Sequence, residues 1–175
     1  MRNLTENHCY LAAPFFNPVQ LVYVEKLEHA ISKTIPVFSP RKGANALEMN
    51  MLLKNKEKPS EDLRNAVFRD NVENIDNAAL VVAVVDGFDV GVMFEVGYAY
   101  AMGVPIVTIT DHDYGCNLML AQSTVGHLKS VDQLQDVLFL MKEYSSWMDM
   151  VIAKYRTSLA LTEGPTERDQ FKKGK

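Results

Sequence analysis

The sequence predicts a single-domain α/β protein built on a parallel sheet. The wholly apolar, β-branched segment 80–85 and the mainly apolar segment 104–109 are typical of strands buried on both faces of such a sheet. Segments with helical periodicity alternate with the strands, which favours parallel strands joined by helical crossovers. The 175 residues have the length of one domain, which we assign to residues 1–160. We therefore expect a flavodoxin/Rossmann-like sheet with helices on both faces.

The N-terminal part is predicted to contain two strands, one helix and a long loop. The helix begins with Asn17 as its N-cap and Pro18 at its first helical position. The two strands are expected at 9–13 and 37–38, on either side of this helix. Residues 41–60 are polar, rich in lysine and asparagine, and lack a clear period. They predict an irregular, mobile excursion.

The rest of the chain is predicted to hold three helices separated by the two apolar strands. These helices span 60–75, 92–102 and 131–155. Gly103 is placed to end the second of them, because glycine adopts the left-handed conformation that follows many helices. Residues 161–175 are charged and lack a period, so we expect a flexible tail.

The composition disfavours several classes of protein. The net charge is −4 and the pI is about 5.6, whereas nucleic-acid binders usually carry a basic face and anionic membranes attract basic segments. No apolar run approaches the roughly 18 residues that span a bilayer, and no secretory leader is evident. Cys9 and Cys116 are too few for a disulfide framework. We expect a cytoplasmic protein with small-molecule ligands and no nucleic-acid or membrane partner.

The loop after the apolar strand 80–85 carries two acidic candidates. Ligands of open parallel sheets bind beyond the carboxyl ends of the strands, and Asp89 lies at that position. Glu95 follows about one turn into the next helix, among apolar neighbours, where the helix N-terminus favours its ionised form. Gly91 would let this helix approach the sheet or a ligand closely. The alternative for Glu95 is an ordinary solvent-exposed helix residue.

Two other loops carry weaker candidates. Phe15 and Phe16 directly follow the first strand, where they would either pack in the core or form a stacking wall for a flat ligand. Asp111 and Asp113 lie in a loop whose spacing matches no calcium pattern, and the histidines form no zinc spacing. Phosphate-binding and nucleophile-elbow motifs are missing from the sequence. We therefore expect neither a metal nor an organic cofactor.

Three segments are similar to parts of one enzyme family. Tyr10-Leu-Ala-Ala-Pro-Phe-Phe matches its opening strand and loop. The segment from Asp89 to Ala99 places an acidic residue six positions before Glu95, with Gly-Tyr-Ala two positions later. Asp-Tyr-Gly-Cys-Asn-Leu-Met at 113–119 matches a third motif, with one residue fewer between its glycine and asparagine. In combination the segments resemble the nucleoside 2-deoxyribosyltransferase family.

The resemblance implies a reaction and a role for each matching residue. The family transfers 2-deoxyribose between nucleobases, through a covalent deoxyribosyl-glutamate, with retention and ping-pong kinetics. Glu95 would be the nucleophile, Tyr10 would orient its carboxylate, and Asp89 would bind the sugar hydroxyls. Asn117 would reach the 5′ hydroxyl in a neighbouring subunit, which implies a homo-oligomer with shared active sites. The base pocket would be walled by Phe15, Phe16 and Met119.

One departure from the family concerns the base. The family usually has an aspartate near the end of the second long helix, and the aligned position here is Asn71, with Asp70 just before it. Asp70 would serve if the helix is shifted by one residue. If Asn71 serves instead, the site loses a possible proton donor for the leaving base.

Two other functions remain open from the sequence. A 2′-deoxynucleoside 5′-monophosphate N-glycosidase could share this fold, with Arg41 and Lys42 binding phosphate or lying in a solvated loop. Asp89 disfavours that reading, because its charge would repel a phosphate, and related nucleotide hydrolases tend to have a serine there. A non-catalytic nucleotide-binding or sensing module is the second alternative, because a fold does not determine function.

Overall fold

Five parallel strands form the centre of the molecule. The structure is a computed structural model, and it describes residues 8–110 and 117–156. The strands are β1 (His8–Ala12), β2 (Val37–Phe38), β3 (Ala78–Val84), β4 (Ile106–Ile109) and β5 (Gly126–Leu128). They pair in the order β2-β1-β3-β4-β5, and each pairing is parallel. The predicted α/β class and its parallel sheet are confirmed.

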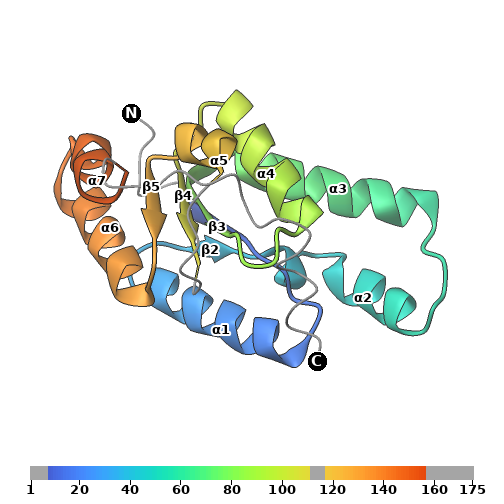
Figure 1. Ribbon diagram of the computed structural model, residues 1–175. Coiled ribbons are helices and arrows are strands. Elements are labelled where there is room, and N and C mark those ends of the chain that lie inside the picture. Colours follow the sequence, from blue (N-terminus) through green and yellow to red (C-terminus); the bar gives the residue numbers. More distant parts are fainter. Residues whose placement is uncertain (1–7, 111–116, 157–175) are drawn as a thin grey trace.

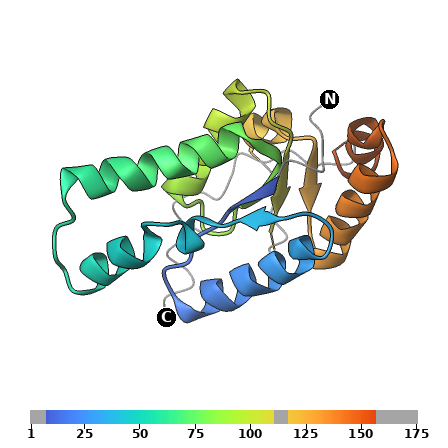
Figure 2. The same cartoon turned by 180° about the vertical axis from the view of Figure 1, so that it is seen from behind.

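Helices cover both faces of this sheet (Figure 1). One face packs against α1 (Pro18–Ser32), α6 (Val131–Glu143) and α7 (Trp147–Tyr155). The other packs against α3 (Glu61–Asp76), α4 (Val90–Ala101) and α5 (Leu118–Ser123). Viewed from behind, α2 (Ala46–Lys54) and much of α3 extend beyond the edge strand β2 (Figure 2).

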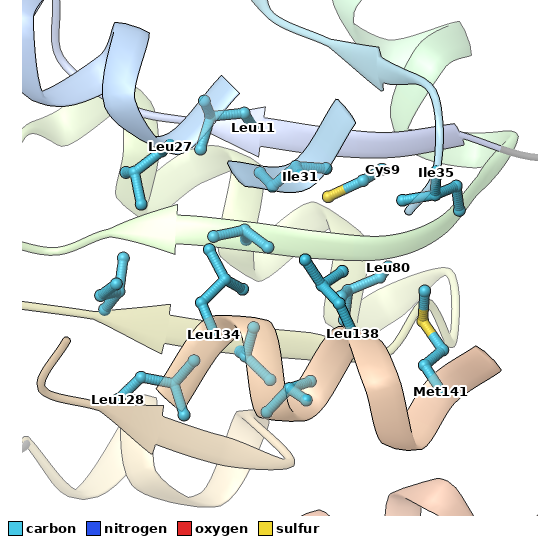
Figure 3. Packing of buried hydrophobic residues seen from close by; sticks show 14 of the residues in the cluster. Cys9, Leu11, Leu27, Ile31, Ile35, Leu80, Leu128, Leu134, Leu138 and Met141 are labelled. Carbon is cyan, nitrogen blue, oxygen red and sulfur yellow. The ribbon is translucent and has the colours of Figure 1, made fainter. Parts of the chain in front are cut away.

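The apolar strands form the core because their side chains alternate between the two faces. All seven residues of β3 are buried. Leu80 joins a cluster with Leu27 and Ile31 of α1 and Leu134 of α6, drawn in Figure 3. Val81 points to the opposite cluster, beneath α4. The second cluster matters for function because it supports the helix that carries Glu95.

The expected helix ends agree with the structure. The Asn17 side chain accepts a hydrogen bond from the Gln20 N–H at 3.0 Å. The Ser60 hydroxyl caps α3 by accepting from the Leu63 N–H at 3.2 Å. Gly103 follows α4 with a φ of +68°, in the left-handed region that favours glycine.

The prediction of an irregular segment over residues 41–60 was wrong. A 3₁₀ helix at Pro40–Lys42 is followed by α2, which was not predicted. Only Ala46 of α2 is buried, while Leu47 and Met51 are exposed. Helix α2 therefore buries almost none of its apolar surface within this chain.

The C-terminal half also differs from the prediction. The expected helix over 131–155 is interrupted between Glu143 and Trp147, so it forms α6 and α7. Strand β5 and helix α5 were not predicted, because each is short: three and six residues. Strand β5 forms the edge of the sheet opposite to β2, and α5 directly precedes β5 in the chain.

Several sequence expectations fall partly or wholly outside the described residues. Cys9 is buried as a free thiol, and burial raises its pKa to about 12. Cys116, Asp111, Asp113 and the tail 161–175 lie outside the described ranges. Within residues 8–110 and 117–156, no helix combines the length and apolarity needed to cross a bilayer.

Candidate active site

Tyr10 and Glu95, 85 positions apart in sequence, meet beside the sheet. Tyr10 lies in β1 next to the central strand β3, and its fully buried side chain points toward α4. Its hydroxyl donates a hydrogen bond of 2.6 Å to the Glu95 Oε1 atom. The two residues that the resemblance paired are therefore in direct contact.

The surroundings of Glu95 favour its protonated form. Burial raises the pKa of Glu95 to about 7, the hydrogen bond from Tyr10 opposes this increase, and the negative charge of Asp89 adds to it. Burial and the neighbouring Glu95 likewise raise the pKa of Tyr10, so its hydroxyl keeps its proton and acts as a donor. Glu95 is thus not an ordinary exposed helix residue, and a carboxyl group poised near neutrality is typical of catalytic groups.

Asp89 is the N-cap of α4. Its Oδ1 atom accepts a hydrogen bond of 3.0 Å from the Val92 N–H, which satisfies one of the free donors at the start of the helix. A Cβ atom at Gly91 would lie 3.1 Å from the same oxygen, so glycine leaves room beside the carboxylate. This arrangement places the two carboxyl groups, Asp89 and Glu95, on the first two turns of one helix.

Asp70, rather than Asn71, is the residue of α3 whose charge reaches Tyr10. The Asp70 carboxylate raises the pKa of Tyr10, after the larger effects of burial and Glu95. The Asn74 amide donates to the Asp70 Oδ1 atom at 3.1 Å. Asn71 is partly buried on the same helix. The sequence left both positions open, and the structure favours Asp70 over Asn71, because Asp70 is the acidic residue of α3 whose charge acts on Tyr10.

One aromatic ring packs against the pair on the β2 side. Phe38, at the end of β2, stacks on the Tyr10 ring with 5.5 Å between centroids. Sequence reasoning missed Phe38, although its place at the end of a predicted strand was a usable signal. Phe15 and Phe16 follow β1 and stack on each other at 5.2 Å, with Phe16 largely exposed.

Asn117 and Met119 lie on a different side of α4. The Asn117 side chain caps α5 by accepting from the Met119 N–H at 2.9 Å. Both residues line an apolar pocket of about 490 Å³, together with Met93 and Gly97 of α4. Those two α4 residues stand two positions from Glu95, roughly 160° around the helix. The structure therefore does not bring Asn117 and Met119 to the Glu95 of the same chain.

Arg41 and Lys42 form an ion cluster rather than a solvated loop. Arg41 donates to both carboxylate oxygens of the buried Glu28, at 2.8 and 2.7 Å. Lys42 approaches the same carboxylate at 2.6 Å. Glu25 also lies 3.6 Å from Arg41, so two carboxylates balance the two cations that the phosphate-binding alternative needed. The described residues also contain no cluster of three or more histidine, cysteine or acidic side chains that could hold a metal.

The fold and this site define a class: an α/β protein with a tyrosine-bound carboxyl group beside a parallel sheet. A family model described as nucleoside 2-deoxyribosyltransferase matches residues 9–132. The chain belongs to that family.

Solved structures support the same assignment. One similar structure is a 2-deoxyribosyltransferase from the psychrotolerant bacterium Bacillus psychrosaccharolyticus, with 29% identity and a TM-score of 0.62. The match covers 74% of this chain and 90% of that one. A conserved protein from Enterococcus faecalis shares the fold, at 22% identity and a TM-score of 0.54, over 77% of this chain and 98% of that one. A comparison with curated proteins gave no match.

Proposed function

We propose that this protein transfers 2-deoxyribose between nucleobases, with Glu95 as the nucleophile. The observation that carries the proposal is the 2.6 Å hydrogen bond from Tyr10 to Glu95, inside a chain of this family. Tyr10 fixes one carboxylate oxygen, which leaves the other free to face a sugar carbon. The pKa of about 7 for Glu95 supports the role, because a substantial fraction of the group is ionised near neutrality.

The first half-reaction forms a glycosyl-enzyme. Positive charge develops at C1′ as the N-glycosidic bond lengthens, as in glycoside hydrolysis. The free oxygen of Glu95 forms a bond to C1′, and the electron pair of the broken C1′–N bond leaves with the base. The leaving nitrogen takes up a proton, for which Asp70 is our candidate donor. Asp89 would hold the sugar hydroxyls while this occurs.

The second half-reaction reverses these steps with a different base. A nitrogen of the incoming base attacks C1′, its proton passes to the Asp70 carboxylate, and the C1′–O bond to Glu95 breaks to restore the Glu95 carboxylate. Two displacements on opposite faces give net retention, and two half-reactions at one site give ping-pong kinetics. Phe15 and Phe16 would wall the base pocket, and excluding water there favours transfer over hydrolysis.

Free deoxynucleosides fit the site better than 5′-monophosphates. The Asp89 carboxylate disfavours a phosphate dianion at the sugar. Arg41 and Lys42 are both bound to Glu28, so neither is held ready for a phosphate. We therefore propose that the substrates are deoxynucleosides and free nucleobases.

We also propose that the protein is a homo-oligomer with shared active sites. Asn117 and Met119 face an apolar pocket on the side of α4 away from Glu95, and Met119 is largely exposed. Tyr100, in the same pocket, is also exposed. A second copy packed over this pocket would cover these apolar groups and receive Asn117 into its own site.

A chromatographic assay tests the proposed reaction. The protein is mixed with deoxyinosine or thymidine and free adenine, and deoxyadenosine is measured. We expect deoxyadenosine from the intact protein and none from Glu95→Ala. Release of free base without deoxyadenosine would indicate a hydrolase, and the assay would be repeated with 5′-monophosphates. Absence of any cleavage would overturn the enzyme assignment in favour of a binding module.

A further inference from the structure

The turn that follows β2 places a glycine beside Asp70 of the candidate active site. Gly43 ends the 3₁₀ helix Pro40–Lys42 and lies against Asp70. A Cβ atom built on Gly43 would stand 2.7 Å from the Asp70 Oδ2 atom, closer than a carbon and an oxygen can approach. Gly43 has a φ of −57° and a ψ of 158°, which alanine also adopts readily. Glycine is therefore needed here for space beside Asp70, and its backbone freedom plays no part.

The other carboxylate oxygen of Asp70 is also held. Asn74, one turn later on α3, donates to Asp70 Oδ1 at 3.1 Å and to the Asp70 carbonyl at 2.7 Å. One oxygen thus accepts a hydrogen bond, while the other occupies the space that the missing side chain of Gly43 leaves open. In this position the Asp70 carboxylate is close enough to Tyr10 for its charge to raise the pKa of the Tyr10 hydroxyl.

The turn itself is anchored to the opposite face of the sheet. Glu28 projects from α1 with a side chain only 6% exposed, and Arg41 binds it through two parallel hydrogen bonds. Bidentate arginine–carboxylate pairs fix both distance and orientation. The Arg41 side chain is 17% exposed, so water competes little for the pair. Lys42 adds a further contact with the same carboxylate.

We propose that Glu28, through Arg41, holds the 39–43 turn so that Gly43 positions the Asp70 carboxylate beside the Tyr10–Glu95 pair. Glu28, Arg41 and Gly43 are then positioning residues, and Asp70 is the group on which they act. The inference rests on the proposed function, because it assumes that Asp70 contributes to the reaction at the base. It adds that the Glu28–Arg41 pair, on the face of the sheet that α1 covers, controls the position of the Asp70 carboxylate.

A double-mutant cycle between Gly43 and Asp70 tests the proposal. In the wild-type background, Gly43→Ala should lower kcat about tenfold or more, because misplacing a catalytic group by about 1 Å can cost up to about a hundredfold. In the Asp70→Ala background the added methyl has no carboxylate to displace, so the same change should alter kcat less than about twofold. Equal losses in both backgrounds would overturn the proposal, and so would full activity of Gly43→Ala.

A second pair of variants tests the anchor. Glu28→Gln removes the charge that holds Arg41 but keeps the shape of the side chain. We expect kcat to fall several-fold, again only when Asp70 is present. Asp136→Asn is the matched control, because it neutralises an ion pair with Lys154 on α6 and α7; its kcat should equal that of the wild type. A wild-type kcat for Glu28→Gln would contradict the role of the Glu28–Arg41 pair in holding the turn.

Crystal structures separate this proposal from the proposed function. In Gly43→Ala, the Asp70 carboxylate should rotate away from residue 43 and lose its bond to Asn74. An unmoved carboxylate would contradict the positioning role whether or not the enzyme is active. Absence of transfer by the wild-type protein would instead contradict the proposed function, and it would be seen before any variant was made.

Discussion

At the scale of single residues, burial and two neighbouring groups determine the ionisation of Glu95. Burial acts against its charged form, the Tyr10 hydroxyl stabilises that form, and the Asp89 carboxylate destabilises it. Tyr10 and Asp89 therefore act on the same carboxyl group with opposite signs. The nucleophile proposed here must be ionised to attack, so each neighbour should influence the pH at which the enzyme works.

The pH dependence of kcat/KM should report these opposite effects. For the wild type, kcat/KM should fall as the pH decreases through about 7, because Glu95 becomes protonated. Tyr10→Phe removes the stabilising hydrogen bond and should move this acidic limb to higher pH. Asp89→Asn removes the repelling charge and should move it to lower pH. Profiles measured by the transfer assay would contradict this account if both variants shifted in the same direction.

The raised pKa of Glu95 should also affect the free energy of unfolding. Between the ordinary value of 4.5 and about 7, the folded protein binds a proton that the unfolded chain does not. Stability should therefore decrease as the pH rises through this window. Glu95→Gln lacks this penalty, so between about pH 5 and about pH 8 it should gain roughly 1–3 kcal/mol relative to the wild type. Urea unfolding at both pH values and one protein concentration measures the difference. If the free energy of unfolding changed equally with pH in both proteins, Glu95 would not be buried in its protonated form.

At the scale of elements, the sequence predicted best where one local signal sufficed. Asn17 and Ser60 are caps that need only their own helix, and the buried strand 80–85 is recognisable from its composition. Helix α2 was missed because the segment 41–60 was interpreted from its lysine and asparagine content, although residues 46–54 contain several strong helix formers.

The same reasoning explains what could be known of the site. The pairing of Tyr10 with Glu95 followed from family motifs, because no local pattern connects β1 with α4. The contact between Gly43 and Asp70 involves neither periodicity nor a motif. It depends on how the turn after β2 lies against α3, and that arrangement becomes visible only when the elements are placed in space.

Asp89 caps α4 and is proposed to bind the sugar hydroxyls, and two substitutions separate these two roles. Serine can also accept from the Val92 N–H, so Asp89→Ser should retain the cap, whereas Asp89→Ala should lose about 1 kcal/mol of stability. Both variants lack the carboxylate, so both should turn over deoxynucleosides more slowly. Asp89→Ser should also accept 5′-monophosphates better than the wild type, because the repelling charge is gone. Thermal unfolding and assays with both substrates test this. Unchanged deoxynucleoside turnover by Asp89→Ser would remove Asp89 from the sugar site.

At the scale of the whole molecule, the predicted site residues of one chain fall into two separate groups. Tyr10, Glu95 and Asp70 gather between β1, α3 and α4, while Asn117 and Met119 line the pocket around the other side of α4. A side chain cannot serve a carboxyl group across a packed helix. If Asn117 takes part in the reaction, it must do so in another copy of the chain, and the oligomer becomes the unit of activity.

Mixing two inactive variants should therefore restore activity. Glu95→Ala lacks the nucleophile but supplies Asn117, while Asn117→Ala supplies the nucleophile. A mixed dimer of these chains holds one site with both native residues. Random exchange of subunits in equal amounts should recover up to about a quarter of the wild-type sites, because half of the dimers are mixed and each has one intact site. The variants are denatured together, refolded and assayed for transfer, with each variant refolded alone as the control. Activity no greater than the mean of the two controls, from a preparation shown by mass spectrometry to contain mixed oligomers, would mean that each chain completes its own site.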